Sequence, residues 1–176
     1  MAEAAAVRPT GMAALLGGGE LDDADVIGAG LQVATVNVAG QVVVGGPLEA
    51  LDAWTPANGA RVRRLAVAGA FHTEAMAPAV PGLTALVDDL QPRDAHCDVV
   101  ANADGARLRD GQELVHRLVA QLTSPVRFDL CLAAVGDATR AVELAPAGVL
   151  AALVKRAQPD LPVTTLKTDA DLAVSA

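Results

Sequence analysis

The sequence predicts an α/β protein, because short strands and helices alternate along its 176 residues. Residues 9–69 read as strand, helix, strand, strand, helix, strand, which is the order of a ferredoxin-like unit. Longer helical segments alternate with strands over residues 70–176, a pattern typical of a parallel sheet covered by helices. We therefore expect a ferredoxin-like subdomain followed by part of a larger α/β domain.

Glycine-bounded apolar runs predict the strands at the start of the first unit. "GMAALLGG" and "LQVATVNVAG" read as strands, and the acidic "ELDDADVIGAG" between them reads as a weak helix. A turn at Gly40 leads into "QVVVGG", a second strand close behind the first. This spacing predicts a hairpin.

A helix and a fourth strand complete the first unit. Pro47 opens "PLEALDAWTPANG" at a helix's first turn, where its missing N–H costs nothing. "ARVRRLAVAG" then reads as a strand, and the strand-like run of small and β-branched residues reaches Gly69 and Ala70. His72 follows at what we expect to be a strand-to-helix junction.

Residues 70–176 are expected to hold longer helices. "FHTEAMAPAVPGLTALVDDL" is helical in composition but should be broken early by Pro78 and Pro81. "CDVVAN" reads as a short buried strand. In "DGQELVHRLVAQL" an acidic cap precedes a leucine stripe, which indicates the best helix of the chain. The cap residues are Asp110 and Glu113, and the stripe is Leu114, Leu118 and Leu122. The remaining segments read in turn as helix, strand, helix and strand: "PVRFDLCLAAVG", "AVELAPAG", "VLAALVKRAQ" and "PVTTLK".

Composition excludes several classes of function. A net charge of −8 provides no basic surface for nucleic acid, and no apolar run reaches the roughly 18 residues that a membrane span needs. The start of the chain lacks the features of a signal peptide. Cys97 and Cys131 make neither a disulfide framework nor a metal framework. We expect a cytoplasmic protein with no metal, no nucleic-acid partner and no membrane partner.

His72 is the leading candidate for proton transfer. A neutral imidazole at pH 7 accepts a proton and returns it as a general acid. The alternative is a partly buried histidine that only hydrogen-bonds a carbonyl group. Asn37 and Asn102 either point carboxamides into a cleft or satisfy turn backbone. The pair His96-Cys97 lacks further metal ligands at useful spacing and is interpreted as structural.

Familiar nucleophile and phosphate-binding motifs are missing from the chain. Its two serines, Ser124 and Ser175, lie outside any G-x-S-x-G elbow. The glycines of "LLGGGE" and "VVVGGP" lack both the phosphate-loop lysine and the dinucleotide-binding spacing. The residues therefore predict neither a self-contained serine or cysteine enzyme nor a nucleotide site.

Five collinear segments resemble the malonyl-CoA:acyl carrier protein transacylases of fatty acid synthesis. Together they extend from Thr10 to about Arg156. The resemblance implies a large α/β-hydrolase-like acyltransferase domain with an inserted ferredoxin-like subdomain, of which this chain holds the C-terminal portion. The segments are "PTGMAALLGG", "NVAGQVVVGG", "VAGAFHTEAMAPA", "VAQLTSPVRFDLC" and "ELAPAGVLAALVKR".

Family members also carry a G-Q-G-S-Q segment, a G-H-S-x-G serine elbow and a following arginine, none of which occurs here. The resemblance thus implies that the serine nucleophile lies on a missing N-terminal half. It implies that this chain is inactive by itself and pairs with such a half.

The resemblance assigns roles to individual residues. His72 matches the catalytic histidine, the general base for the serine. Gln121 aligns with a residue whose backbone carbonyl accepts the histidine Nδ1–H, which leaves Nε2 free. Asn37 and Gln41 match positions near the bound acyl and pantetheine groups, and Asn102 matches a position beside the histidine.

The resemblance also implies the substrates, which are malonyl-CoA and phosphopantetheinylated acyl carrier protein, with no cofactor. Phe71 matches a phenylalanine that is associated with selection of malonyl over methylmalonyl groups. Two alternatives remain open. One is an acyltransferase segment of a polyketide synthase, which shares the histidine motif, and the other is a non-catalytic ferredoxin-like binding or assembly module in which His72 is structural.

Overall fold

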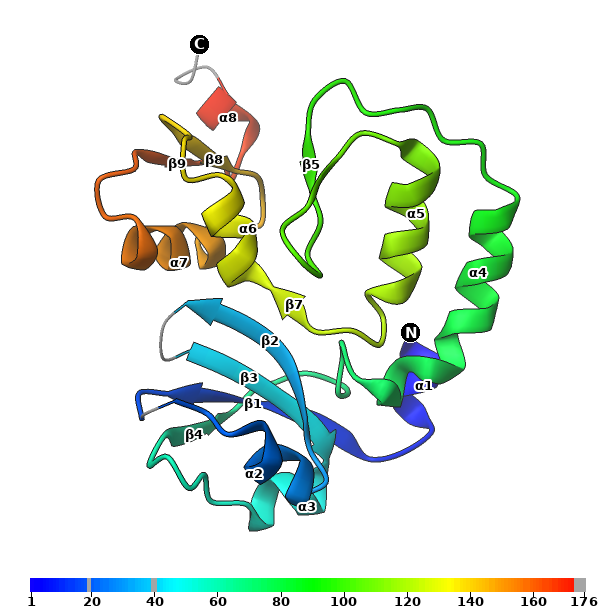
Figure 1. Cartoon of the computed structure of the whole chain (residues 1–176), viewed down its shortest axis with the longest axis vertical. Helices are drawn as coiled ribbons and strands as arrows, with labels where there is room; N and C mark the ends of the chain where they lie inside the picture. Colours follow the sequence, from blue (N-terminus) through cyan, green and yellow to red (C-terminus); the bar gives the residue numbers. More distant parts are fainter. Residues whose placement is uncertain (19, 39–40, 173–176) are drawn as a thin grey trace. The chain divides into compact units, whose positions relative to one another are not determined.

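A mixed sheet organises the first part of the chain in the computed structural model, which describes residues 1–18, 20–38 and 41–172 (Figure 1). Among these residues the strand order is β4-β1-β3-β2-β7, with β2 and β7 parallel and the other neighbours antiparallel. The strands are β1 (Thr10–Leu16), β2 (Gln32–Val38), β3 (Gln41–Pro47), β4 (Arg61–Arg64) and β7 (Val126–Arg127).

The two faces of this sheet are covered differently. On one face, α2 (Asp23–Gly28) and α3 (Leu48–Ala53) contribute Val26 and Leu51 to a core with alternate residues of β1 and β3. The side chains in this core are small, so backbones must approach closely to fill it. On the other face, Leu65 and Phe71 pack against a second apolar cluster. That cluster consists of Met12, Ala14, Ala34 and Val43.

The hairpin between β2 and β3 is confirmed, because the two strands pair antiparallel with Val38 opposite Gln41. The predicted turn residue Gly40 lies outside the described residues. The predicted helices α2 and α3 are also present, and Pro47 immediately precedes the latter.

The fourth strand is shorter than expected. It ends at Arg64, so the prediction of a strand reaching Ala70 is wrong. The Leu65 N–H still bonds the Met12 carbonyl at 2.9 Å, but the Val67 N–H bonds back to Leu65 at 3.0 Å and leaves no ladder to continue. His72 consequently lies in a turn after an irregular segment, and not at the end of a strand.

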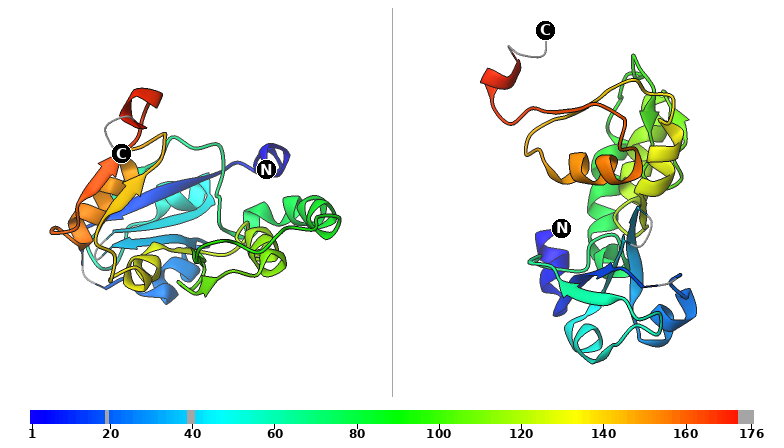
Figure 2. Two further views of the ribbon diagram at one scale, coloured as in Figure 1. Left: turned by 90° about the horizontal axis from the view of Figure 1, so that it is seen from above. Right: turned by 90° about the vertical axis from the view of Figure 1, so that its left-hand side faces the viewer.

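Prolines divide the helical region after His72 as predicted. Pro78 lies inside the 3-10 helix η1 (Glu74–Ala79), and Pro81 occupies the first turn of α4 (Val80–Asp88). The next helix, α5 (Gly111–Ala120), lies beside α4 (Figure 2).

The cap of α5 is confirmed, but its leucine stripe is not a buried one. The Asp110 carboxylate accepts the Glu113 N–H at 2.7 Å. Leu118, in the middle of this stripe, is 63% exposed. Val119 is the buried residue in that turn of the helix. Val119 packs inward, unlike Leu118, because successive side chains point toward different sides of a helix.

The remaining strands are short and do not form one sheet. β5 (Val99–Val100) and β6 (Arg107–Leu108) make an antiparallel pair, and β8 (Ala141–Glu143) and β9 (Val163–Thr165) make a parallel pair. Val99 is 38% exposed, so the prediction of a buried strand there is wrong. The strands described after residue 70 thus do not form the expected parallel helix-covered sheet. β7 joins the first sheet, β5 and β6 pair antiparallel, and β8 and β9 form a separate parallel pair.

The chain divides into two compact units, residues 1–131 and residues 132–176. In the second unit, α7 (Val149–Ala157) connects the parallel strands β8 and β9. No helix within the described ranges is both long and apolar enough to cross a membrane. The other helices are α1 (Ala2–Ala6), α6 (Phe128–Ala134) and α8 (Asp169–Leu172).

A carboxylate caps the helix of the second unit. Glu143 accepts N–H groups from Gly148 at 2.7 Å, Leu150 at 2.8 Å and Ala151 at 3.0 Å. Desolvation acts to raise the pKa of Glu143, but these hydrogen bonds outweigh it and hold the pKa below its ordinary value. The charged form therefore stabilises the fold above that ordinary value, and this contribution is lost as the pH falls through the lowered pKa.

We predict that Glu143→Gln lowers the melting temperature at pH 7, because the amide offers a single neutral oxygen to these donors. The difference from the unsubstituted chain should shrink on acidification below pH 4.5, where the unfolded carboxyl protonates. Thermal unfolding followed by circular dichroism at both pH values measures this. Equal melting temperatures at pH 7 would contradict the capping role.

Candidate active site

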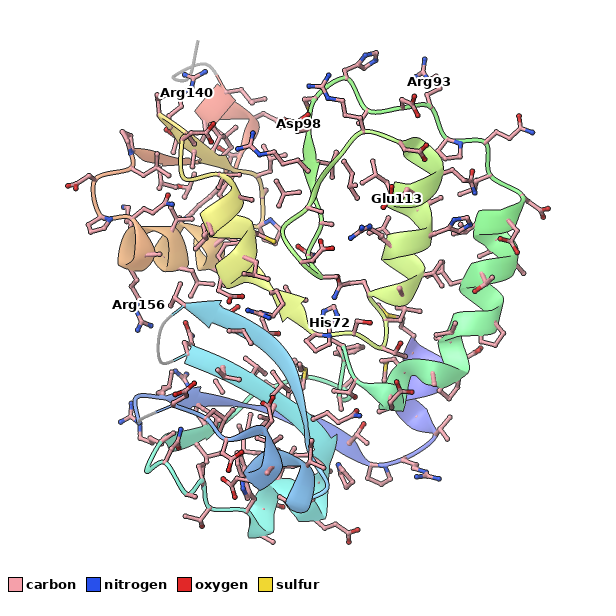
Figure 3. The ribbon with its side chains drawn as sticks, viewed as in Figure 1. His72, Arg93, Asp98, Glu113, Arg140 and Arg156 are labelled. Atoms are coloured by element: carbon pink, nitrogen blue, oxygen red, sulfur yellow. The ribbon has the colours of Figure 1, made fainter. Side chains whose placement is uncertain are left out.

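His72 is joined to the end of a helix that lies far from it in the sequence. Its Nδ1 is 2.9 Å from the carbonyl oxygen of Gln121, 49 residues away, and the ring is half-buried (Figure 3). Gln121 is the C-cap of α5, where carbonyls have no partner within the helix. A neutral ring that donates its Nδ1–H to this oxygen presents Nε2 as a proton acceptor.

The contact at Nδ1 persists when the other ring nitrogen accepts a proton. The Nδ1–H···O bond becomes a charge-assisted one when the imidazole becomes imidazolium. His72 is thus placed to gain a proton at Nε2 without giving up its partner at Nδ1.

Gln121 contributes to this arrangement twice. Its backbone carbonyl faces His72, while its side-chain Nε2 donates to the carbonyl of Ser124 at 2.9 Å. The residue is 9% exposed, so the side chain is held inside the fold. The second bond fixes the turn that follows α5 and with it the direction of the carbonyl.

The backbone of His72 is strained. Its φ of 61° lies in the left-handed region, which costs a residue with a Cβ about 1–2 kcal/mol. The surrounding structure must therefore hold the turn in place. Two threonine hydroxyls bond the backbone of the buried Ala70: its N–H donates to Thr10 Oγ1 at 3.1 Å, and its carbonyl accepts from Thr73 Oγ1 at 2.6 Å.

Thr73 was not singled out from the sequence. It is 2% exposed and is the N-cap of η1, where its hydroxyl accepts the Ala75 N–H at 3.3 Å. A threonine followed by Glu74 at the start of a helical segment is a recognised N-cap signal, and it could have identified this residue.

A cavity of about 250 Å³ lies against His72. Its wall includes the polar residues Asp23, Gln32 and Thr123. Gln32 also reaches the turn directly, since its Oε1 accepts the Glu74 N–H at 2.9 Å. Among the predicted site residues within the described ranges, only His72 lines this cavity.

The other predicted site residues lie in several places. Asn37 occupies an irregularity of β2, between the paired residues Val36 and Val38, where a bulge redirects a side chain. Gln41 begins β3. The carbonyl of Asn102 accepts the Arg127 N–H at 2.7 Å, and its side-chain oxygen lies 3.9 Å from the sulfur of Cys131. Phe71 is half-buried and packs against both the Met12 cluster and a cluster of Ala4, Ala5 and Met76.

Metal-competent residues do not gather. The part of the chain that the structure describes contains no group of three or more His, Cys, Asp or Glu side chains able to hold a metal ion. Cys97 is exposed and Cys131 is buried, and both are free thiols. Burial raises the pKa of the Cys131 thiol, which keeps it in its unreactive form.

Known proteins are similar to this chain in both sequence and fold. A malonyl CoA-acyl carrier protein transacylase of Mycolicibacterium smegmatis is 42% identical over 184 residues, which cover 98% of this chain and 62% of the relative. The Mycobacterium tuberculosis protein of the same name is 42% identical over 180 residues, covering 98% and 59%. Over 98% of its length, this chain is therefore similar in sequence to the malonyl CoA-acyl carrier protein transacylases. It spans about three fifths of the length of these relatives. No family model matches it.

Solved structures of transacylases are similar to this chain as well. The M. tuberculosis transacylase has a TM-score of 0.90 at 42% identity, with 98% of this chain and 59% of that one covered. The Helicobacter pylori transacylase has a TM-score of 0.88 at 26% identity, with 99% and 58% covered. A complex of a malonyl-transacylase with its type II polyketide synthase acyl-carrier protein gives 0.82 at 25% identity, with 95% and 58% covered.

Close packing under the histidine turn explains why one position of β3 is a glycine. A Cβ on Gly45 would lie 3.1 Å from both the Ala70 Cβ and the Thr73 Cγ2. Ala70 is fully buried and bonded at both its N–H and its carbonyl, so it has little freedom to move away. The turn that carries His72 therefore rests directly on β3.

We predict that Gly45→Ala destabilises the fold by about 1–3 kcal/mol through overpacking. The matched control is Gly82→Ala in α4, where a Cβ would meet nothing within 4 Å. That exchange should stabilise the helix by up to about 1 kcal/mol. Urea unfolding of both variants measures the two effects, and a neutral or stabilising Gly45→Ala would refute the close approach.

Proposed function

We propose that this chain supplies the histidine of a transferase that moves malonyl groups from malonyl-CoA to acyl carrier protein in fatty acid synthesis. The observation that carries the proposal is the 2.9 Å contact between His72 Nδ1 and the Gln121 carbonyl. This contact leaves Nε2 free to accept a proton, beside a cavity. The names of the curated relatives support the reaction.

The proposed reaction has two half-reactions with the same proton acceptor. In the first, His72 Nε2 accepts the proton of a serine hydroxyl while the serine oxygen attacks the malonyl thioester carbonyl. The tetrahedral intermediate expels the coenzyme A thiolate, which takes the proton back from the imidazolium. In the second, His72 accepts the proton of the phosphopantetheine thiol, whose sulfur attacks the acyl-serine. The serine oxygen leaves with that proton, and the malonyl thioester of the carrier protein is formed.

The serine in this scheme belongs to the part of the transacylases that this chain does not span, which we propose is an N-terminal half. We further propose that residues 9–69 form a ferredoxin-like subdomain. The strand order β4-β1-β3-β2, with α2 and α3 as the two helical connections, supports this assignment. Residues 70–176 would then be the C-terminal part of an α/β-hydrolase-like domain.

Acyl carrier protein is the proposed partner, and the solved complex of a related malonyl-transacylase with its carrier protein supports it. We propose a cytoplasmic location and a reaction that needs no cofactor. Asn37 and Gln41 are proposed to lie near the bound acyl and pantetheine groups, and Asn102 near the histidine. The bulge at Asn37 supports a redirected side chain there.

We predict that His72→Ala lowers the rate of malonyl transfer by about 10²–10⁴-fold, the usual contribution of a general base. The chain is mixed with a polypeptide that supplies the serine elbow of a related transacylase, and transfer of labelled malonyl groups to carrier protein is measured. His116→Ala is the matched control, because this histidine of α5 is 53% exposed in its side chain.

The control variant should keep full activity. A complex that forms tightly but gives no turnover, with or without His72, would reject the transferase and favour the assembly module. Equal rates for His72→Ala and the unsubstituted chain would reject His72 as the proton acceptor.

We predict that Phe71→Ser, in the same reconstituted enzyme, raises the ratio of methylmalonyl to malonyl transfer. Removing the ring opens space for one α-methyl group, which an apolar pocket discriminates by about 1–3 kcal/mol. The ratio of the two initial rates measures the change. An unaltered ratio would mean that Phe71 serves only the apolar clusters against which it packs.

A further inference from the structure

The turn that carries His72 is closed by one side chain. The Thr73 hydroxyl donates to the Ala70 carbonyl at 2.6 Å and accepts the Ala75 N–H at 3.3 Å. These two partners lie on opposite sides of His72 in the chain, so the hydroxyl connects the residues before the histidine to those after it. Both of its hydrogen-bonding functions are used inside the fold, where Thr73 is 2% exposed.

His72 needs such a constraint. Its left-handed backbone is unfavourable for a residue with a Cβ and persists only where neighbouring contacts hold it. Because the direction of the ring depends on this backbone, relaxation of His72 toward a common φ would redirect its side chain. The Nδ1 contact with Gln121, at 2.9 Å, would then be lost.

We propose that Thr73 is a positioning residue for His72. Its hydroxyl holds the turn in the left-handed conformation that directs Nδ1 to the Gln121 carbonyl and Nε2 toward the cavity. The catalytic part of this inference rests on the proposed function of His72. The conformational part does not, since it concerns a contact within this chain.

Three substitutions distinguish the effect of the Thr73 hydroxyl from the effect of the size of its side chain. Thr73→Val removes the hydroxyl and keeps the shape. Thr73→Ser keeps the hydroxyl and removes the methyl group that faces Gly45. Thr84→Val is the matched control, because the Thr84 hydroxyl also donates to a backbone carbonyl, that of Val80 at 2.9 Å, but within α4.

The first readout is the protection of the His72 Nδ1–H from exchange with water, measured by NMR on the full chain and assigned with His72→Gln. We expect a protected signal in the unsubstituted chain, in Thr73→Ser and in Thr84→Val, and its loss in Thr73→Val. Retention of the signal in Thr73→Val would overturn the proposal. Loss of the signal in Thr73→Ser would overturn it as well, because packing of the methyl group would then hold the turn. The serine variant keeps the test decisive even if the valine variant does not fold.

The second readout is malonyl transfer in the reconstituted enzyme. We expect Thr73→Val to lower kcat by about tenfold or more, since small misplacements of a catalytic group have large effects, with KM little changed. Thr73→Ser and Thr84→Val should stay within about twofold of the unsubstituted rate, as expected for substitutions that leave His72 in place. Unchanged kcat in Thr73→Val, together with a lost Nδ1–H signal, would reject the catalytic part. Absence of transfer in every variant, including the unsubstituted chain, would instead reject the proposed function and leave the NMR result standing.

Discussion

The contact between the His72 ring and the Gln121 carbonyl is the interaction on which the account of this chain depends. It joins a strained turn after β4 to the C-terminal end of α5. A helix end is suited to this purpose because its last carbonyls have no partner within the helix. The same bond selects the ring nitrogen that remains available, so one contact sets both the orientation and the protonation pattern of the imidazole.

Small residues make this contact possible. The turn before His72 reaches the sheet because Gly45 has no side chain and Ala70 has only a methyl group, which is fully buried. The backbone of Ala70 is then too deep for water, and hydroxyls of Thr10 and Thr73 bond its two polar groups. The small side chains of an alanine-rich and glycine-rich sequence thus permit one backbone segment to pack directly on another beside a functional group.

Local patterns in the sequence were sufficient for the succession of strands and helices over residues 9–69, for the proline breaks after His72 and for the Asp110 cap. Each of these depends on residues close together in the chain. The end of β4 could not be predicted in this way, because it depends on residues far away in the sequence. The Leu65 N–H bonds the Met12 carbonyl in the last step of the ladder, whereas the Ala70 N–H bonds the Thr10 hydroxyl instead. The exposure of Leu118 could not be predicted for a related reason: periodicity defines a face of a helix but not what covers it.

The candidate site, too, has features that could be predicted from local sequence and features that could not. The imidazole could be recognised as a proton acceptor from its own chemistry, whereas its pairing with Gln121 followed only from resemblance to the transacylases. No pattern of residue types connects positions 49 apart when the acceptor is a backbone carbonyl. Thr73 lay within reach of sequence reasoning as an N-cap, but its contact with Ala70 is visible only in the folded turn.

The tautomer of the neutral His72 ring tests this account most directly. The nitrogen chemical shifts of the ring, measured by NMR on the full chain above the pH at which the imidazole protonates, report which nitrogen carries the hydrogen. The geometry predicts a protonated Nδ1 and a bare Nε2. A ring with hydrogen on Nε2 would contradict it, because that nitrogen would then be unable to accept a proton from a hydroxyl group.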